Sequence, residues 1–265
     1  MSISDDVSSN NEQSLKGQRL FQIRRLVEEH GQMTVLELSG IFKVSEATIR
    51  RDLEEMDGQW IRRTHGGAIR LERAAKEPPV INRCREQTDE KKRIAQAAFR
   101  MIQEGETIFL GSGTTIHEIA RLIPDDFQLT VITNSILVVN ELTGHPKIDL
   151  MVIGGMLRLS ELSMVGHIAE QAIHEFRADK VFLGMRAIDI KQGFTSDFLP
   201  ETMTDRAILA MAPIVIIVAD HSKFNRVSSV FVAPITAANT IIADKGISSE
   251  LAMELSEQGI EVITA

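Results

Sequence analysis

The sequence lacks the features that mark secreted and membrane proteins. It contains one cysteine, Cys84, which excludes an intrachain disulfide and fits a reducing compartment. No apolar run approaches the roughly 18 residues that a membrane-spanning helix needs. The first residues, MSISDDVSSNNEQSLKG, contain neither a basic segment nor an apolar one, unlike a secretory leader. We therefore expect a cytoplasmic protein without membrane contacts, whose polar N-terminus is disordered.

Positive charge is also scarce, and it is unevenly distributed. The formal net charge of −8 argues against nonspecific coating of nucleic acid. Residues 15–75 nevertheless carry 11 Lys and Arg against 9 Asp and Glu, whereas residues 76–265 carry 18 against 25. An acidic body is repelled by DNA, so any contact with DNA is expected only through the region 34–71, where the arginines cluster.

Apolar residues recur at helical spacing in three short segments of the basic region. These sets are Leu20, Ile23 and Val27; Val35, Leu38 and Phe42; and Ile49, Leu53 and Met56. Gly31 ends the first pattern, Thr34 can cap the second helix, and Ser45 can cap the third. The pattern predicts three helices joined by tight turns.

The third helix carries its polar residues on the face opposite the apolar stripe. Ala47 and Arg51 point away from the stripe, and Thr48 and Arg50 flank them. In a helix-turn-helix, the second helix of the motif lies in the major groove and its N-terminal side chains reach base edges. Arginine suits this role because its planar fork pairs with guanine edges or with phosphate.

The segment WIRRTHGGAIRL follows directly and predicts a β-hairpin with HGG at its turn. A basic hairpin after a recognition helix is typical of a wing that touches the DNA backbone or minor groove. The predicted DNA-binding residues of the whole module are Thr34, Ser45, Ala47, Thr48, Arg50, Arg51, Arg62, Arg63, His65, Gly66 and Gly67.

Both features have a simpler explanation. Two adjacent arginines on a helix usually form a solvated face, and His65 alone could be an ordinary turn residue. The combination of spacing, caps, hairpin and local charge favours DNA binding for the module as a whole. The hypothesis is a winged helix-turn-helix domain over residues 15–72, joined to the rest by a charged linker, residues 73–80, which contains Pro78 and Pro79.

Residues 81–265 alternate between short apolar runs and amphipathic segments. Strands are predicted at 107–111, 129–134, 148–155, 180–185, 213–220, 240–244 and 260–265, with helical segments between several of them. The runs are apolar without alternation, as expected when both faces of a sheet are buried. We therefore predict an α/β domain with a mostly parallel sheet.

The carboxyl ends of these strands carry small, polar or cationic residues, and ligands of parallel sheets bind at such ends. The segment GSGTT offers hydroxyls from Ser112, Thr114 and Thr115 and a helix N-terminus, which together suit a phosphate monoester. Arg186 and Lys223 are candidate counter-charges. Turn chemistry alone could also explain a loop rich in Gly, Ser and Thr.

The same loop matches neither a P-loop nor a dinucleotide fingerprint, because it lacks GK[ST] and the third glycine. We predict no catalytic residue, no metal and no cofactor. Asp189, Asp197 and Glu201 lie in a loop-like stretch, where solvation is the default and binding of sugar hydroxyls is the alternative.

The segments VSEATIRRDL and RRTHGGA resemble the N-terminal signature of the DeoR family of bacterial regulators, and PVINR, EKKRIA, SGTT, TNS, FRADKVFLG and ADHSKF resemble the C-terminal sensor of that family. The resemblance covers residues 15–250. It implies a fold like ribose-phosphate isomerase, a sugar-phosphate effector and repression relieved by that effector. Carried to matching positions, it implies an effector site at Ser112, Gly113, Thr114, Thr115, Asn134, Gly155, Asp220 and Lys223.

Two functions remain open at this point. The first is a DNA-binding regulator, acting as a dimer or larger homo-oligomer on double-stranded operator DNA and responding to a phosphorylated sugar. The second is a sugar-phosphate isomerase with an appended DNA-binding module, for which Glu201, Asp189 or Asp197 could serve as general base. An assay for isomerase turnover on pentose and hexose phosphates discriminates between them.

Overall fold

The computed structural model describes residues 3–58, 61–70, 72–73 and 77–265. The chain forms two compact units, Met1–Glu72 and Arg73–Ala265. Residues 74–76 of the predicted linker lie outside the described residues. Among the helices in the described ranges, none combines the length and the apolar character needed to cross a bilayer.

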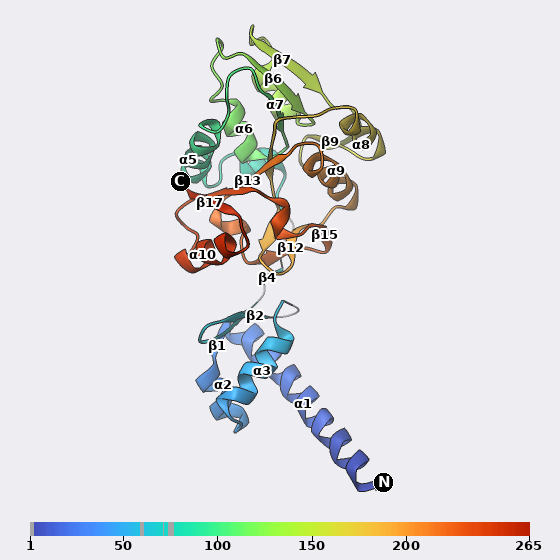
Figure 1. Cartoon of the computed structure of the whole chain (residues 1–265), viewed down its shortest axis with the longest axis vertical. Coiled ribbons are helices and arrows are strands. Elements are labelled where there is room, and N and C mark those ends of the chain that lie inside the picture. The colour runs from blue at the N-terminus through green and yellow to red at the C-terminus, as the bar shows by residue number, and fades with distance from the viewer. Residues whose placement is uncertain (1–2, 59–60, 71, 74–76) are drawn as a thin grey trace. The chain divides into compact units, whose positions relative to one another are not determined.

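Over its described residues, the N-terminal unit contains three helices and a small sheet (Figure 1). The helices are α1 (Ile3–His30), α2 (Val35–Phe42) and α3 (Glu46–Met56); the strands are β1 (Gln32–Thr34), β2 (Ile61–Thr64) and β3 (Gly67–Arg70). The strands β2 and β3 pair antiparallel with Thr64 opposite Gly67, so His65 and Gly66 form the turn. The predicted hairpin and the predicted helix-turn-helix are confirmed.

One apolar cluster holds this unit together. Its fully buried members include Ile23 of α1, Leu38 of α2, and Ile49 and Leu53 of α3. These are residues of the three predicted stripes, because helical spacing gathers them on the faces that meet. Thr34 forms a capping box with Glu37 at the start of α2, and the Ser45 side chain accepts a hydrogen bond from Thr48 N at the start of α3.

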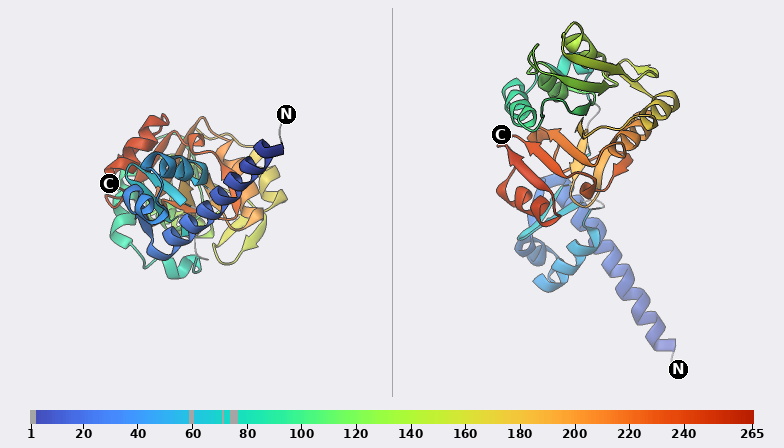
Figure 2. Two further views of the ribbon diagram at one scale, coloured as in Figure 1. Left: turned by 90° about the horizontal axis from the view of Figure 1, so that it is seen from below. Right: turned by 45° about the horizontal axis from the view of Figure 1, so that its top comes forward.

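Two features of this unit differ from expectation. The N-terminal segment expected to be disordered continues α1 back to Ile3 as one long helix (Figure 2). A helix already nucleated by packed residues such as Ile23 extends without a new nucleation cost, so a polar sequence can continue it. The strand β1 was also not predicted, since its three residues are too short to show a periodic pattern.

The C-terminal unit is built on a seven-stranded, fully parallel sheet in the order β17-β16-β13-β10-β5-β6-β7. The strands are β5 (Thr107–Leu110), β6 (Leu129–Thr133), β7 (Ile148–Val152), β10 (Lys180–Gly184), β13 (Ile214–Ala219), β16 (Thr240–Ala243) and β17 (Glu261–Thr264). All seven coincide with the predicted apolar runs, which confirms the α/β class.

Helices cover both faces of this sheet, because successive strand residues point to opposite sides. One face packs on α5 (Thr88–Phe99), α6 (Thr114–Ala120) and α7 (Ile136–Leu142). The other packs on α8 (His167–His174), α9 (Leu199–Leu209) and α10 (Ser249–Glu257). In β10, Phe182 belongs to the apolar cluster on the first of these faces, and its neighbours Val181 and Leu183 belong to the cluster on the second.

Short elements surround the sheet. They are β4 (Glu72–Arg73), α4 (Val80–Arg83), β8 (Met156–Arg158), β9 (Ser163–Val165), β11 (Ala187–Asp189), β12 (Gly193–Ser196), η1 (His221–Lys223), β14 (Arg226–Val227), β15 (Val230–Ala233) and η2 (Ile235–Ala237). The stretch interpreted as a loop, residues 187–201, is therefore β11, β12 and the start of α9. Asp189 is buried there, and its carboxylate accepts hydrogen bonds from the backbone N–H groups of Lys191 and Gln192.

Candidate functional site

The exposed face of α3 presents the side chains predicted to read DNA. Ala47, Arg50 and Arg51 are exposed at and after the first turn of the helix. Arg50 lies 3.3 Å from Glu46, an i,i+4 ion pair between two half-exposed side chains. Exposed pairs of this kind contribute little stability, so Arg50 can exchange Glu46 for a phosphate at small cost.

The cap of α3 uses the hydroxyls of Ser45 and Thr48, whose oxygens lie 2.9 Å apart. Ser45 is exposed and Thr48 is half-buried. The two residues fix the start of the helix and hold its first N–H groups near the exposed surface, where a helix N-terminus favours a phosphate group. Thr34 has the same capping role in α2, where its hydroxyl oxygen accepts a hydrogen bond from the backbone N–H of Glu37 at 3.2 Å.

The hairpin β2–β3 lies beside this face. Arg63 and His65 are exposed, and Arg62 is half-buried. The Arg63 guanidinium lies 3.5 Å from Glu54 of α3, and its backbone N–H donates to Asp57 at 2.9 Å. These contacts tie the hairpin to the C-terminal half of α3, so that the basic side chains of the two elements belong to one surface.

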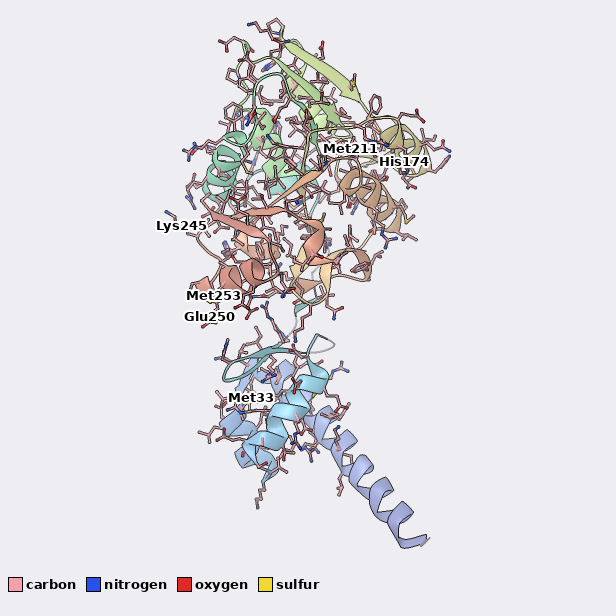
Figure 3. The ribbon with its side chains drawn as sticks, viewed as in Figure 1. Met33, His174, Met211, Lys245, Glu250 and Met253 are labelled. Atoms are coloured by element: carbon pink, nitrogen blue, oxygen red, sulfur yellow. The ribbon has the colours of Figure 1, made fainter. Side chains whose placement is uncertain are left out.

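Gly66 in the turn and Gly67 at the start of β3 have different surroundings. A Cβ at Gly67 would stand 2.1 Å from the carbonyl oxygen of Met33, the buried β1 residue labelled in Figure 3. A Cβ at Gly66 would meet nothing within 4 Å. Gly67 is therefore required for β3 to approach β1, and Gly66 is the exposed member of the pair.

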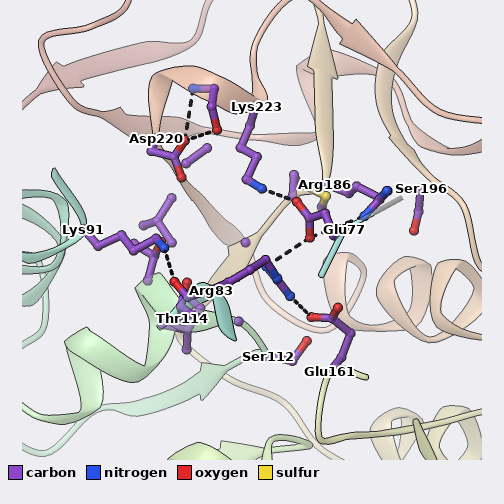
Figure 4. Close-up of a pocket in the computed structure, with 18 of the residues that line it drawn as sticks. Glu77, Arg83, Lys91, Ser112, Thr114, Glu161, Arg186, Ser196, Asp220 and Lys223 are labelled. Carbon is purple, nitrogen blue, oxygen red and sulfur yellow. Dashed lines mark hydrogen bonds and ion pairs between the residues drawn. The ribbon is translucent and has the colours of Figure 1, made fainter. Parts of the chain in front are cut away.

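A cavity of about 100 Å³ opens over the middle of the parallel sheet. It lies at the carboxyl ends of β5, β10 and β13, which are neighbours in the sheet. Its polar lining consists of Glu77, Arg83, Glu86, Gln87, Lys91, Ser112, Thr114, Thr115, Arg158, Glu161, Arg186, Thr195, Ser196, Glu201, Asp205, Asp220, Ser222 and Lys223. Figure 4 shows the arrangement.

The GSGTT loop forms one wall of the cavity. Gly113 is the N-cap of α6, has φ of 112°, and offers no side chain to cap the helix. No side-chain cap therefore satisfies the first N–H groups of α6, which belong to Thr114 and Thr115, and both residues line the cavity. Of the predicted effector residues, the structure brings together Ser112, Gly113, Thr114, Thr115, Arg186, Asp220 and Lys223.

Two predicted effector residues lie outside the cavity lining. Asn134 is buried, and its side-chain amide donates to the carbonyl of Met164 at 3.0 Å. Gly155 lies where an added Cβ would stand 2.9 Å from the carbonyl oxygen of Val165. Both residues follow β6 and β7, which are further along the sheet than the strands that carry the cavity, and both pack against β9.

The opposite wall carries cations and carboxylates in contact with one another. Glu77 accepts from Lys223 and lies 3.0 Å from Arg83 and 3.4 Å from Arg186. Arg186 also lies 3.1 Å from Asp197. Burial works to raise the pKa of Glu77, but the attraction of Lys223, Arg83 and Arg186 outweighs it and holds that pKa below its usual value.

The sequence did not single out Arg83 and Lys91 as site residues. Arg83 pairs with Glu161 as well as Glu77, and Lys91 donates to the carbonyl oxygens of Arg83 and Glu86 at 2.8 and 2.6 Å. Burial lowers the pKa of the Lys91 ammonium, while the attraction of Asp220 opposes this shift. Both residues belong to the segments PVINR and EKKRIA, so the family resemblance was the signal that could have found them.

Two acidic residues, Glu201 and Asp205, also line the cavity. Glu201, at the start of α9, accepts from Arg158, which also lies 3.6 Å from Asp197 and stacks on Phe198 at 4.6 Å. Burial raises the pKa of Glu201 to about 7, and the repulsion of Glu161 and Asp197 adds to this against the attraction of Arg158. Burial and the charge of Glu201 likewise raise the pKa of Asp205.

Asp189, Asp197 and Glu201 were expected to be solvated by default, and the structure corrects that expectation for Glu201 as it does for the buried Asp189. Glu201 lies at the cavity. Its side chain is 13% exposed, because α9 packs its first turn against the cavity wall. The chemistry available in the cavity is therefore anion binding at the Lys223 side and hydrogen bonding to hydroxyls at the Glu201 side. Within the ranges that the structure describes, no cluster of His, Cys, Asp and Glu is arranged to hold a metal ion.

Comparison with known families divides the chain as the fold does. Residues 19–74 match the family described as the DeoR-like helix-turn-helix domain. Residues 86–245 match the family described as the DeoR C terminal sensor domain. The first match contains the α3 and hairpin surface, and the second contains the strands that carry the cavity.

Curated relatives match over nearly the whole length. A putative aga operon transcriptional repressor of Escherichia coli O157:H7 is 34% identical over 93% of this chain and 93% of its own. The glycerol-3-phosphate regulon repressor of Escherichia coli strain K12 is 34% identical over 86% of this chain and 90% of its own.

Solved structures include a ribose 5-phosphate isomerase A from Methanocaldococcus jannaschii, with a TM-score of 0.39 and 16% identity over 52% of this chain and 55% of that one. The two family matches and the full-length relatives agree with the motifs in α3, in the hairpin and around the cavity. The chain therefore belongs to the DeoR family of helix-turn-helix transcriptional regulators.

Proposed function

We propose that this regulator represses a carbohydrate-metabolism operon and that a sugar phosphate, bound in the cavity of the C-terminal unit, changes its affinity for operator DNA. The observation that carries the proposal is the convergence of Lys223, Arg83 and Arg186 at the carboxyl ends of the central strands, in a cavity that the uncapped start of α6 also lines. Such a site suits a phosphate dianion.

The rest of the cavity suits the sugar. Glu201 and Asp205 line it, so their carboxyl oxygens can face hydroxyl groups of a bound ligand. Polar groups of this kind fix the orientation of a small ligand. The names of the relatives, which refer to the aga operon and to the glycerol-3-phosphate regulon, are consistent with an effector of this class.

The DNA-binding surface of the proposal consists of the N-terminal half of α3 and the hairpin. Arg51, on the exposed face of α3, is assigned to base edges or phosphates in the major groove, with Arg50, Thr48, Ala47 and Ser45 around it. Arg62, Arg63, His65 and Gly66 are assigned to the backbone or minor groove. Gly67 and Thr34 support this surface, the first by close packing and the second as a helix cap.

We also propose that the protein acts as a dimer or larger homo-oligomer, since dimers of this motif bind two half-sites of an operator. The edge strand β7 and the elements after it expose apolar side chains, including Val152, Met156, Leu159 and Ile168. Large exposed apolar surface is typical of an interface. The molar mass in solution, measured by light scattering, tests this proposal, and a monomer at micromolar concentration contradicts it.

The effector proposal is tested by titration calorimetry with a panel of pentose, hexose and triose phosphates. Each sugar without its phosphate serves as the matched control. We expect one phosphate ester to bind and its unphosphorylated partner to bind at least about 10-fold more weakly, because the cations and the α6 N-terminus then lack their ligand. Equal binding of both members of every pair contradicts a phosphate site.

A second candidate function, isomerisation of a sugar phosphate, rests on Glu201. A carboxyl whose pKa is about 7 is matched to general base catalysis near neutral pH. The assay is turnover of pentose and hexose phosphates by the wild type and by Glu201→Gln. Turnover by the wild type that is lost in Glu201→Gln supports the enzyme. If the wild type turns over none of the esters that it binds, Glu201 is a binding residue.

A further inference from the structure

Glu77 stands at the point where the cations of the cavity meet. It accepts from Lys223 of η1 and lies 3.0 Å from Arg83 of α4 and 3.4 Å from Arg186, which follows β10 (Figure 4). The Glu77 side chain is 17% exposed. Three cations from three separate elements thus surround one carboxylate in a largely buried site.

The three cations form an anion-binding site, and the carboxylate of Glu77 occupies it. Three convergent donors around a carboxylate are the same groups that would bind a phosphate, because both ligands are oxyanions and charge-assisted hydrogen bonds hold both. Lys223 has Glu77 as a carboxylate partner. Each of the two arginines also contacts a second acid, Glu161 for Arg83 and Asp197 for Arg186. Arg83 donates as well to the carbonyl oxygen of Pro78 at 3.0 Å. A phosphate therefore competes with Glu77 for Lys223 and for part of Arg83 and Arg186.

The position of Glu77 in the chain gives this competition a consequence. Glu77 precedes Pro78 and Pro79 and lies five residues beyond Glu72, where the DNA-binding unit ends. A carboxylate on this segment is held near the cations at a high effective concentration by its short connection to α4. Its release would remove one of the contacts that hold residues 77–79 in place, beside the hydrogen bond from Arg83 to the carbonyl oxygen of Pro78.

Building on the proposed function, we propose that Glu77 is a tethered competitor of the effector. In the absence of effector its carboxylate occupies the anion position between Lys223, Arg83 and Arg186. The phosphate of the effector displaces it, and the displaced segment transmits binding to the DNA-binding unit. Glu77 thereby sets the affinity for the effector and couples effector binding to the DNA-binding unit.

The test is titration of the full-length protein with inorganic phosphate and with the sugar phosphate that binds the wild type most tightly. Glu77→Gln keeps the shape of the side chain and removes its charge. We expect both ligands to bind Glu77→Gln at least about 10-fold more tightly, because the anion position is then open for a larger fraction of the time. Glu86→Gln is the matched control, since Glu86 lines the same cavity outside the three-cation contact.

The outcomes distinguish failure of the Glu77 proposal from failure of the proposed effector site. Equal tightening in Glu77→Gln and Glu86→Gln, or weaker binding in Glu77→Gln, overturns the competitor. If neither ligand binds the wild type or Glu77→Gln, both the competitor and the proposed effector site fail. Glu77→Asp keeps the charge on a shorter side chain, and its affinity for both ligands is expected to lie between those of the wild type and Glu77→Gln. This variant keeps the test decisive if Glu77→Gln proves unstable.

A second measurement tests whether displacement of Glu77 changes the affinity for operator DNA. Without any effector, operator DNA should bind Glu77→Gln with an affinity shifted from that of the unliganded wild type toward that of the wild type saturated with sugar phosphate. The affinity is measured by fluorescence anisotropy at fixed salt concentration. An unshifted affinity, together with tighter phosphate binding, contradicts the transmission and leaves Glu77 only as a competitor.

Discussion

The guanidinium of Arg19 in α1 donates two hydrogen bonds to the carboxylate of Asp52 in α3, with Nε–Oδ2 and Nη2–Oδ1 distances of 2.6 and 3.1 Å. The Asp52 side chain is 2% exposed and that of Arg19 is 19% exposed. This two-point contact fixes the rotation of α3 relative to α1, and with it the direction in which Arg50 and Arg51 point. The orientation of the DNA-binding face thus depends on an ion pair on the opposite side of the helix.

Asp52→Ala is expected to lower the free energy of unfolding of the N-terminal unit by about 2 kcal/mol, because it leaves the partly buried Arg19 without its carboxylate. Glu55→Ala is the matched control. Glu55 also joins α3 to α1, through Lys16 at 2.5 Å, but both side chains are about half exposed. Exposed pairs contribute about 0–1 kcal/mol, so equal losses in urea unfolding would contradict the role given to Asp52.

Gly67→Ala is expected to disrupt the pairing of β1 with β3. The new Cβ would stand 2.1 Å from the carbonyl oxygen of Met33, and strand backbone cannot yield by that much without losing its hydrogen bonds. Overpacking of this kind costs about 1–3 kcal/mol. Gly66→Ala, one residue away with open space around it, should unfold like the wild type. Similar thermal midpoints for the two variants would show that β1 and β3 are not in close contact.

Arg51→Ala is expected to weaken operator binding about 5- to 150-fold, the effect of losing one base or phosphate contact of 1–3 kcal/mol. Arg51 is exposed, so circular dichroism and the thermal midpoint should not change. Arg100→Ala, an equal charge change at an exposed position of the C-terminal unit, is the control. A folded Arg51→Ala protein with wild-type affinity removes this arginine from the recognition surface.

The fold could be predicted from the sequence wherever burial leaves a periodic or continuous apolar pattern. All seven strands of the central sheet were predicted because each contains a short run of mostly apolar residues. The stripe of Ile49, Leu53 and Met56 predicted the buried face of α3. The helix α9 was not predicted, since its sequence LPETMTDRAIL mixes polar side chains with a proline. Its burial depends on tertiary contacts such as that of Thr204 with the backbone of Gly166.

Some residues of the candidate site could be predicted from the sequence and others could not. Ser112, Thr114, Thr115 and Lys223 follow strands, so their convergence at one edge of the sheet could be expected from topology. Glu77 could not, because its partner Lys223 is 146 residues away and nothing in the local sequence indicates the pairing. The same holds for Arg158 and Glu201, which are 43 residues apart.

The pKa of Glu201 predicts a pH dependence of stability. The folded-state pKa is about 7 against a usual value of 4.5, so the folded protein binds this proton more tightly than the unfolded chain does. The stabilisation is fully present below pH 4.5 and is lost as the pH rises to 7. It amounts to at most about 3 kcal/mol, from 1.36 kcal/mol per unit.

Glu201→Gln removes this contribution, so its free energy of unfolding should rise relative to that of the wild type as the pH is raised from 4.5 to 7.5. Chemical unfolding at several pH values measures the difference. Glu250→Gln, at an exposed position of α10 (Figure 3), is the charge-matched control. A constant difference between Glu201→Gln and the wild type across this range contradicts the raised pKa.

A regulator of the proposed kind requires coupling between the cavity and the DNA-binding surface. The most direct measurement is fluorescence anisotropy of DNA from upstream of the gene that encodes this protein, with and without each sugar phosphate, for the wild type and for Lys223→Ala. We expect salt-sensitive binding that one phosphate ester weakens about 5- to 150-fold, corresponding to a coupling of 1–3 kcal/mol. Lys223→Ala should bind the same DNA and lose the response. Specific binding that no ester changes, or a full response in Lys223→Ala, would contradict the account.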